Sequence, residues 1–262
     1  ILPDTPQLFF WLISLYMLVK ALPGQPITRS RATMLFFASI PLGLAMLSKY
    51  TSVFLWVGAG LYILIYNRAW LRRSEVYLAV IVSLLIFSPV IFWNIENQWI
   101  SFTFQGERVS FFGSGLRIDY FFQELFGQIL YNNPVNFVII IIALVAMLRG
   151  RFPIDKDHKS ILLLTSLPLI LLFLFFALFR RTLPHWTAPG YISLILLASA
   201  YLAGKAIKSG RVKLFPREIV ISISVLMFVL ALGIIQIKTG VIPQPPADDP
   251  KEIGKNDVTL DM

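Results

Sequence analysis

The chain has 262 residues, of which 57% are hydrophobic and 14% are charged, with a net charge of +9 and a mean hydropathy of +0.74. Soluble domains carry about a quarter charged residues, so this composition excludes an ordinary water-soluble domain. Cysteine is absent, which excludes disulfides, thiol catalysis and cysteine-based zinc sites. The apolar residues come in long blocks, which is typical of helices surrounded by lipid. We therefore expect an all-α integral membrane protein, built as a polytopic helical bundle.

Eight apolar runs along the chain are suitable for crossing a membrane. In chain order they occupy residues 6–22, 33–48, 51–66, 76–93, 134–148, 160–179, 187–204 and 218–237. Several are shorter than the ~20 residues that a full crossing needs, so these helices must tilt or end within the membrane. We expect about eight transmembrane helices, with residues 1–237 as the transmembrane region.

Both ends of the sequence suggest a fragment of a longer protein. The chain begins with Ile1, without an initiator Met and without the basic and apolar regions of a signal peptide. Residues 238–262 form a polar tail that does not read as a finished domain. We expect this tail to lie on the outer side and to open a truncated C-terminal domain.

The basic residues indicate which helix ends face the cytoplasm. The connections 20–32, 67–75, 149–159 and 205–217 hold 15 of the 23 Lys and Arg residues and border only four acids. Such an excess is typical of cytoplasmic loops. The positive net charge is therefore a topology signal, and nucleic acid is excluded as a partner.

The long segment 94–133 lies on the opposite, outer side and is too apolar for a free loop. Within 117–131, five apolar residues are spaced at i, i+3, i+4, i+7 and i+8, namely Phe122, Leu125, Phe126, Ile129 and Leu130. This spacing predicts an amphipathic helix lying on the outer leaflet. The helix is either a simple membrane anchor or one wall of a cavity open to a lipid substrate.

Three single residues on the outer side are candidates for a site. Asp4 precedes the first run in a good helix-start sequence, and a catalytic or metal-binding role is the alternative to that structural role. Lys49 lies where two short runs meet almost without a loop, and it reaches either lipid phosphates or an anionic partner. Arg108 stands beside aromatic residues, where it either extends to lipid headgroups or contacts substrate.

The turn "FALFRRTLPHWTAPGY" at 176–191 concentrates further candidates. Arg180 and Arg181 lie on the outer side against the topological preference, and forked guanidinium donors match phosphate oxygens. His185 adds a switchable donor beside Trp186. An aromatic belt with arginines bound to ordinary anionic lipid is the alternative interpretation. The other histidine, His158, is expected on the cytoplasmic side, so no zinc-type His spacing exists.

Four stretches, in this order, together resemble a known family: "PDTPQLFFWLISLYML", "GLAMLSKYTSVFL", "FSPVIFWNIENQWISFTFQGERV" and "RRTLPHWTAPGYISL". They are similar to the bacterial membrane glycosyltransferases of family 39, which are relatives of the dolichyl-phosphate-mannose protein mannosyltransferases and of the lipid A aminoarabinose transferase. The resemblance covers most of residues 1–205. It implies a GT-C-type fold in the bacterial inner membrane, with the active site facing the periplasm. The implied reaction transfers a sugar, with inversion, from a polyprenyl-phosphate carrier to a protein, lipid or glycan acceptor.

The resemblance also assigns roles to the outer residues. It implies that Lys49, Arg180, Arg181 and His185 bind the phosphate of the carrier, and that Asp4 is a site or metal residue. Fixed cations would stabilise the negative charge that grows on the leaving phosphate. The implied substrate is a lipid-linked sugar, and a divalent metal is the one cofactor to consider.

One departure from the family and one rival function remain. The acidic pair of the family's first outer loop has no counterpart here, so the resemblance places the main base upstream of Ile1.

The alternative function is a transporter or flippase of lipid-linked intermediates. Such a protein would carry internal repeats and ionisable residues within its spans, and the sequence has neither.

Overall fold

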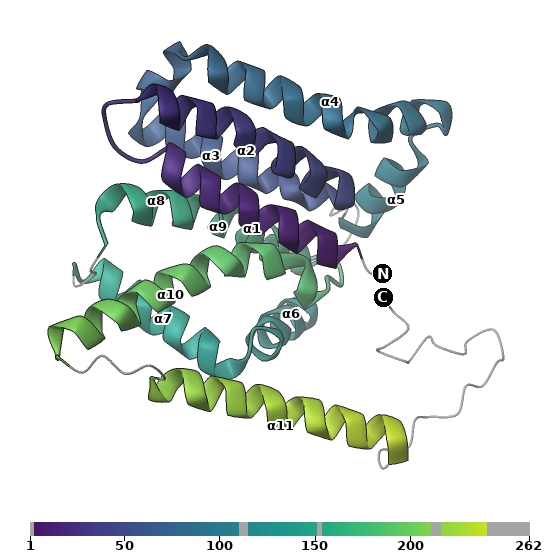
Figure 1. Cartoon of the computed structure of the whole chain (residues 1–262). Helices are drawn as coiled ribbons and strands as arrows, with labels where there is room; N and C mark the ends of the chain where they lie inside the picture. Colours follow the sequence, from purple (N-terminus) through teal and green to yellow (C-terminus); the bar gives the residue numbers. More distant parts are fainter. Residues whose placement is uncertain (1–2, 110–114, 151–153, 211–215, 240–262) are drawn as a thin grey trace. The chain divides into compact units, whose positions relative to one another are not determined.

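The computed structural model describes residues 3–109, 115–150, 154–210 and 216–239, and in these ranges every regular element is a helix (Figure 1). The predicted all-α class is confirmed. The chain divides into two compact units, the first over residues 3–212 and the second over residues 213–262. The described part of the second unit is a single helix, α11 (Arg217–Thr239).

The first unit contains ten α-helices among the described residues. They are α1 (Asp4–Ala21), α2 (Arg29–Ser48), α3 (Val53–Tyr66), α4 (Ser74–Glu96), α5 (Ile100–Val109), α6 (Ile118–Tyr131), α7 (Pro134–Leu148), α8 (Lys156–Leu164), α9 (Leu167–Ala177) and α10 (Ala188–Lys208). Three short 3₁₀ helices join them: η1 (Tyr50–Ser52), η2 (Arg68–Arg72) and η3 (Pro184–Thr187).

All eight predicted apolar runs form helices, of which 160–179 is divided between α8 and α9, and the polytopic bundle is confirmed. By length and composition, five described stretches could cross a membrane: Arg29–Ser48, Ser74–Glu96, Lys156–Ala177, Pro184–Lys208 and Arg217–Thr239. The pair α6 and α7, bent by 101°, makes a sixth if it counts as one span. The count is below the eight expected because some runs form short helices, such as α3 with 14 residues, against the ~20 of a full crossing.

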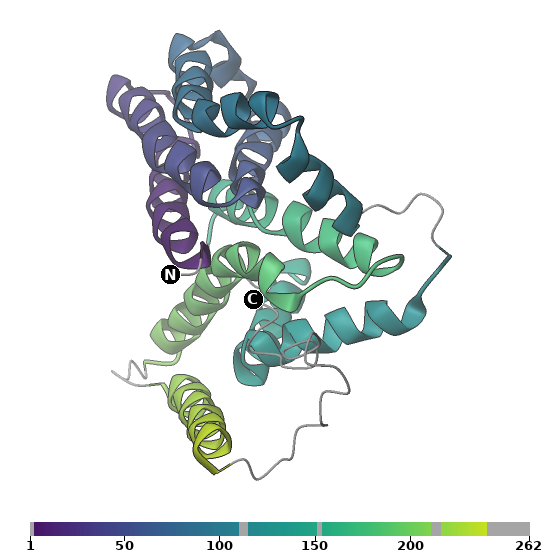
Figure 2. The ribbon, with the colours of Figure 1, turned by 90° about the vertical axis from the view of Figure 1, so that its right-hand side faces the viewer.

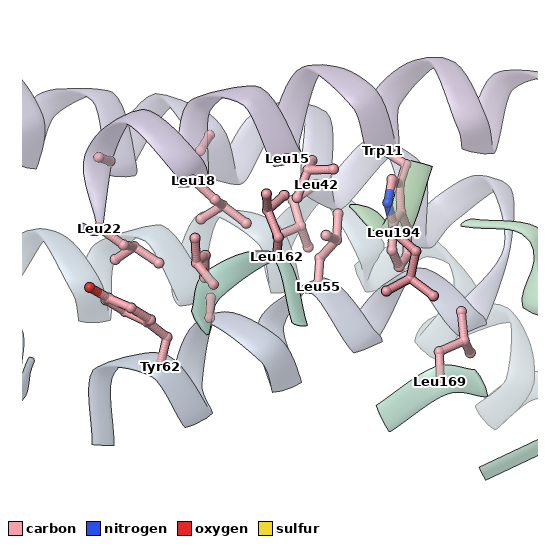
Figure 3. Packing of buried hydrophobic residues seen from close by; sticks show 14 of the residues in the cluster. Trp11, Leu15, Leu18, Leu22, Leu42, Leu55, Tyr62, Leu162, Leu169 and Leu194 are labelled. Atoms are coloured by element: carbon pink, nitrogen blue, oxygen red, sulfur yellow. The ribbon is translucent and has the colours of Figure 1, made fainter. Parts of the chain in front are cut away.

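The core of the first unit forms around one face of α1. Trp11, Leu15 and Leu18 are almost fully buried at positions spaced by three or four residues. Figure 3 shows them facing leucines and a tyrosine from five other helices: Leu42, Leu55, Tyr62, Leu162, Leu169 and Leu194. Phe9, Leu12 and Tyr16 on other faces of α1 are 59%, 48% and 63% exposed. Exposed apolar side chains of this kind are expected on helices that face lipid.

A glycine allows α3 to approach the break between α8 and α9. A Cβ atom at Gly58 would lie 2.5 Å from the backbone oxygen of Leu164 and 2.7 Å from the Cα of Thr165. These neighbours are backbone atoms, which cannot rotate away as a side chain can. Small residues at such crossings are common in membrane bundles because they let backbones approach closely.

Three of the four predicted cytoplasmic connections, 20–32, 67–75 and 149–159, meet at one end of the first unit, which we call the basic end. The guanidinium of Arg31 donates hydrogen bonds to five backbone carbonyls, those of Ala21, Leu22, Pro23, Gly24 and Pro26. The side-chain amide of Asn67 donates to the carbonyl oxygen of Gly24 at 3.2 Å, and the backbone N–H of Gly24 donates to Asp157 Oδ2 at 3.0 Å. Connections 20–32, 67–75 and 149–159 are thereby joined to one another.

We predict that Gly58→Ala destabilises the protein by about 1–3 kcal/mol, since the added methyl group meets backbone atoms that must move. Gly60→Ala is the matched control on the same helix, because nothing lies within 4 Å of a Cβ at that position. Thermal unfolding of both variants in nanodiscs measures the difference. An equal melting temperature for the two variants would contradict the close contact.

Candidate functional site

An ion pair joins two of the predicted site residues at the end of the unit away from the basic end. Lys49 Nζ donates to Asp4 Oδ1 at 2.6 Å, and the two side chains are 21% and 29% exposed. Asp4 lies in the first turn of α1, and Lys49 has an extended backbone between α2 and η1. The break in helical structure at Lys49 therefore lets its side chain reach the start of a different helix.

A buried glutamine continues this polar contact along α1. Gln7 is fully buried, and its Nε2 donates to Thr51 Oγ1 at 2.9 Å and to Ser52 Oγ at 3.0 Å. Its Oε1 is buried without a hydrogen-bond partner. Sequence reasoning missed Gln7, although Asp4 and Gln7 are spaced at i, i+3 on one helix face, and paired polar residues at the start of an apolar helix are a usable signal.

Helix α5 is attached to η1 by a second set of contacts. The hydroxyl groups of Tyr50 and Ser101 share a hydrogen bond of 2.9 Å, and Ser101 Oγ donates to Asn94 Oδ1 at 2.7 Å. The ring of Tyr50 stacks on Phe102, with centroids 5.0 Å apart. These contacts hold α5, and with it Arg108, beside the ion pair.

Arg108 links α5 to the turn that follows α9. Its guanidinium carbon lies 5.1 Å from the ring centroid of Trp186 and 5.3 Å from that of Phe104, which is the geometry of cation–π contacts. Figure 2 shows α5 next to this turn, although the two are far apart in sequence. The pairing of Arg108 with Trp186 was not foreseen from the sequence.

His185 completes the group. Its ring is half-buried, lies 6.2 Å from the ring of Tyr131 and is close enough to Lys49, Asp4 and Arg108 to interact with them electrostatically. We call Asp4, Lys49, Arg108 and His185 the outer cluster. Tyr131 was also missed by the sequence analysis.

The two remaining predicted residues lie at the beginning of the same turn. Arg180 and Arg181 follow α9 directly and are both exposed. They add positive charge to the segment that immediately precedes η3, the short helix that contains His185. With Lys49 and Arg108, the predicted site residues include four cations and one carboxylate, that of Asp4. Such an excess favours an anionic ligand.

The outer cluster offers little to a metal ion. In the part of the chain that the structure describes, no group of three or more His, Asp or Glu side chains could hold one. Asp4, the candidate metal residue, has its Oδ1 bound to Lys49. This carboxylate oxygen is therefore shared with the ammonium group of Lys49.

The predicted amphipathic helix is confirmed as α6. Phe122, Phe126 and Leu130 are 48%, 60% and 70% exposed, whereas Glu124 and Gln128 are buried against the protein. The apolar face is therefore the one available to lipid, and the polar face contacts the rest of the unit. Segment 94–133 contains α5 as well as α6; residues 110–114 lie outside the described residues.

The fold defines a class of protein: a polytopic, all-α membrane protein, in which the predicted site residues Asp4 and Lys49 pair at one end of the helices. Residues 1–93 match the family of dolichyl-phosphate-mannose-protein mannosyltransferases. The match covers Asp4 and Lys49. It confirms the resemblance inferred from the sequence and supports a membrane glycosyltransferase of this kind.

A second comparison extends beyond the matched region. The chain is 28% identical over 159 residues to the lipid A galacturonosyltransferase RgtD of Rhizobium johnstonii. The alignment covers 60% of this chain and 32% of the relative, so the chain spans about a third of that protein's length. No solved structure matches the chain significantly.

We predict a measurable coupling between Asp4 and Lys49. In a double-mutant cycle, the loss of unfolding free energy in the double variant Asp4→Asn/Lys49→Gln should be smaller than the sum of the two single losses by about 1 kcal/mol. The reason is that each single change already removes the same ion pair. Thermal or denaturant unfolding in nanodiscs measures the cycle.

The control cycle pairs Asp4→Asn with Lys20→Gln, which alters an exposed lysine at the other end of α1. This second cycle should be additive. Additivity in both cycles would show that the Asp4–Lys49 pair contributes nothing to stability.

Proposed function

We propose that the chain is the transmembrane part of a glycosyltransferase that uses a polyprenyl-phosphate-linked sugar and transfers the sugar on the outer side of the bacterial inner membrane. The single observation that carries this proposal is the outer cluster, in which side chains from separate segments lie together: Lys49 is paired with Asp4, and Arg108 and His185 belong to the same group. The similarity to two kinds of membrane glycosyltransferase supports it. The orientation follows from the Lys and Arg excess at the basic end.

The charges of the outer cluster suit a phosphate leaving group. As the glycosidic bond breaks, negative charge accumulates on the carrier phosphate, and cations held in a partly dry site stabilise that charge. We assign this role to Lys49 and Arg108, with Arg180 and Arg181 at the entrance of the turn and His185 as a further donor. Asp4 accepts from Lys49 and so orients the ammonium group, which makes it a positioning residue in this scheme. Its oxygen is committed to a cation, and a role as general base fits less well.

An apolar groove, lined in part by residues near Lys49 in sequence, suits the hydrocarbon chain of the carrier. The groove has a volume of about 340 Å³ and lies among α2, α3 and α4. Its lining includes Met46 and Val53, which flank Lys49 in sequence, and continues to Leu71 and Val76 near the basic end. Several lining residues, such as Leu64 at 50% exposure, are open to the surroundings of the unit. A polyprenyl chain in this groove would leave its phosphate close to the outer cluster.

The proposal is tested with the full-length enzyme and a lipid-linked sugar donor. We expect Lys49→Met to lower kcat/KM for the donor by roughly 100-fold or more, since removal of one donor to a developing oxyanion costs about that much. The double change Arg180→Ala and Arg181→Ala should also lower it. Rates are measured as transfer of radiolabelled sugar to the acceptor.

Arg72→Ala is the matched control, because Arg72 is an exposed arginine at the basic end. It should leave donor use unchanged. Unchanged donor kinetics in Lys49→Met, with normal expression and folding, would refute the phosphate role.

A further inference from the structure

The polar face of α6 is attached to the turn between α9 and α10 at both ends of that turn. Before the turn, the backbone N–H of Arg117 donates to the carbonyl oxygen of Leu178 at 2.7 Å. After the turn, Tyr191 Oη donates to Gln128 Oε1 at 2.7 Å. Helix α6 therefore bridges the entry and the exit of the segment that carries Arg180, Arg181 and His185.

The bridge is a chain of buried polar groups. Gln128 Nε2 donates to Glu124 Oε1 at 2.8 Å, and both side chains are at most 1% exposed. The hydroxyl of Thr182, in the middle of the turn, lies next to the Glu124 carboxylate in a geometry too loose for a well-formed hydrogen bond. Buried polar groups lose much free energy when their partners are removed. Breaking the hydrogen bonds among Glu124, Gln128 and Tyr191 would therefore destabilise the protein, which favours this one arrangement.

A close contact lies between these polar groups along the same face of α6. A Cβ atom at Gly127 would overlap the ring of Pro184, so only glycine lets α6 approach the turn this closely. The contacts to the turn and its exit come from Glu124, Gly127, Gln128 and Tyr131, which follow the i, i+3, i+4, i+7 spacing of one helix face. One continuous face of α6 thus packs on Thr182, Pro184, His185 and Tyr191.

We propose that Glu124 and Gln128 are positioning residues, which hold the turn at 180–187 through Tyr191 and so fix the place of its arginines and of His185. The expected effect on donor use rests on the proposed function. The holding of the turn by α6 does not depend on that function. The lipid-facing residues of α6 anchor the helix in the membrane. Its polar face contacts the turn at 180–187 and so holds the turn in place.

The test compares two identical changes on one helix. Gln128→Leu removes both side-chain hydrogen bonds of the bridge, whereas Gln123→Leu makes the same change at an exposed position. In the full-length protein in nanodiscs, trypsin cleavage after Arg180 and Arg181 reports how firmly the turn is held, without any substrate. We expect cleavage in Gln128→Leu to be roughly fivefold to tenfold faster, the ratio that loss of about one hydrogen bond gives. Gln123→Leu should match the wild type.

Tyr191→Phe is the second variant, because it deletes only the hydroxyl that donates to Gln128 and leaves the ring in place. It should also speed cleavage at the turn, and should do so even if Gln128→Leu fails to fold. Cleavage in Tyr191→Phe at the wild-type rate would overturn the inference.

Donor kinetics of the same variants separate this inference from the proposed function. If the turn binds the donor phosphate, Tyr191→Phe should raise KM for the lipid-linked donor severalfold and leave KM for the acceptor unchanged. Faster cleavage with unchanged donor KM would support the holding of the turn by α6 and would count against a donor role of the turn.

Discussion

Polar side chains on helices surrounded by lipid must find their partners within the protein, because the hydrocarbon region offers no water. This constraint explains where the charged and amide groups of the first unit lie. At the basic end, Arg31 donates to carbonyl groups of the connection between α1 and α2, three of which belong to the buried residues Ala21, Leu22 and Pro23. At the other end, Lys49 is paired with Asp4, and Gln7 is paired with two hydroxyl groups. The long apolar faces between these ends are left free for lipid and for helix packing.

The same constraint gives the outer cluster its chemical character. Lys49 is held by one carboxylate and Arg108 by aromatic rings, and His185 is close enough to both to interact with them electrostatically. Aromatic rings orient a cation without neutralising it. Under the proposed function, the charge of Arg108 would help to stabilise the negative charge on a departing phosphate.

The general architecture was predictable from the sequence, and the pairing of distant residues was not. Long apolar blocks predicted the helices, and Lys and Arg counts predicted that connections 20–32, 67–75 and 149–159 share one end. The short lengths of α1, α3 and α7 also agree with runs that fall below the ~20 residues of a crossing. These properties depend on local composition, which the sequence shows directly.

Contacts across the fold depend on packing that no local pattern encodes. The spacing of Phe122, Phe126 and Leu130 indicated an amphipathic helix, but not that its polar face would contact the turn at 180–187. The contact of Arg108 with Trp186 joins residues 78 positions apart in the printed sequence. Gln7 was overlooked because a single amide does not change the assignment of an apolar run as a membrane helix. In lipid, however, such an amide requires a hydrogen-bond partner.

The account's central claim is that the outer cluster binds the phosphate of a lipid-linked sugar and assists its departure. Release of free polyprenyl phosphate tests it most directly, with the full-length protein in nanodiscs incubated with a radiolabelled polyprenyl-phosphate sugar and an acceptor. We expect polyprenyl phosphate to appear in step with the glycosylated acceptor and Lys49→Met to slow the formation of both by roughly 100-fold or more. A lipid-linked sugar that stays intact, or crosses the bilayer without cleavage, would contradict it.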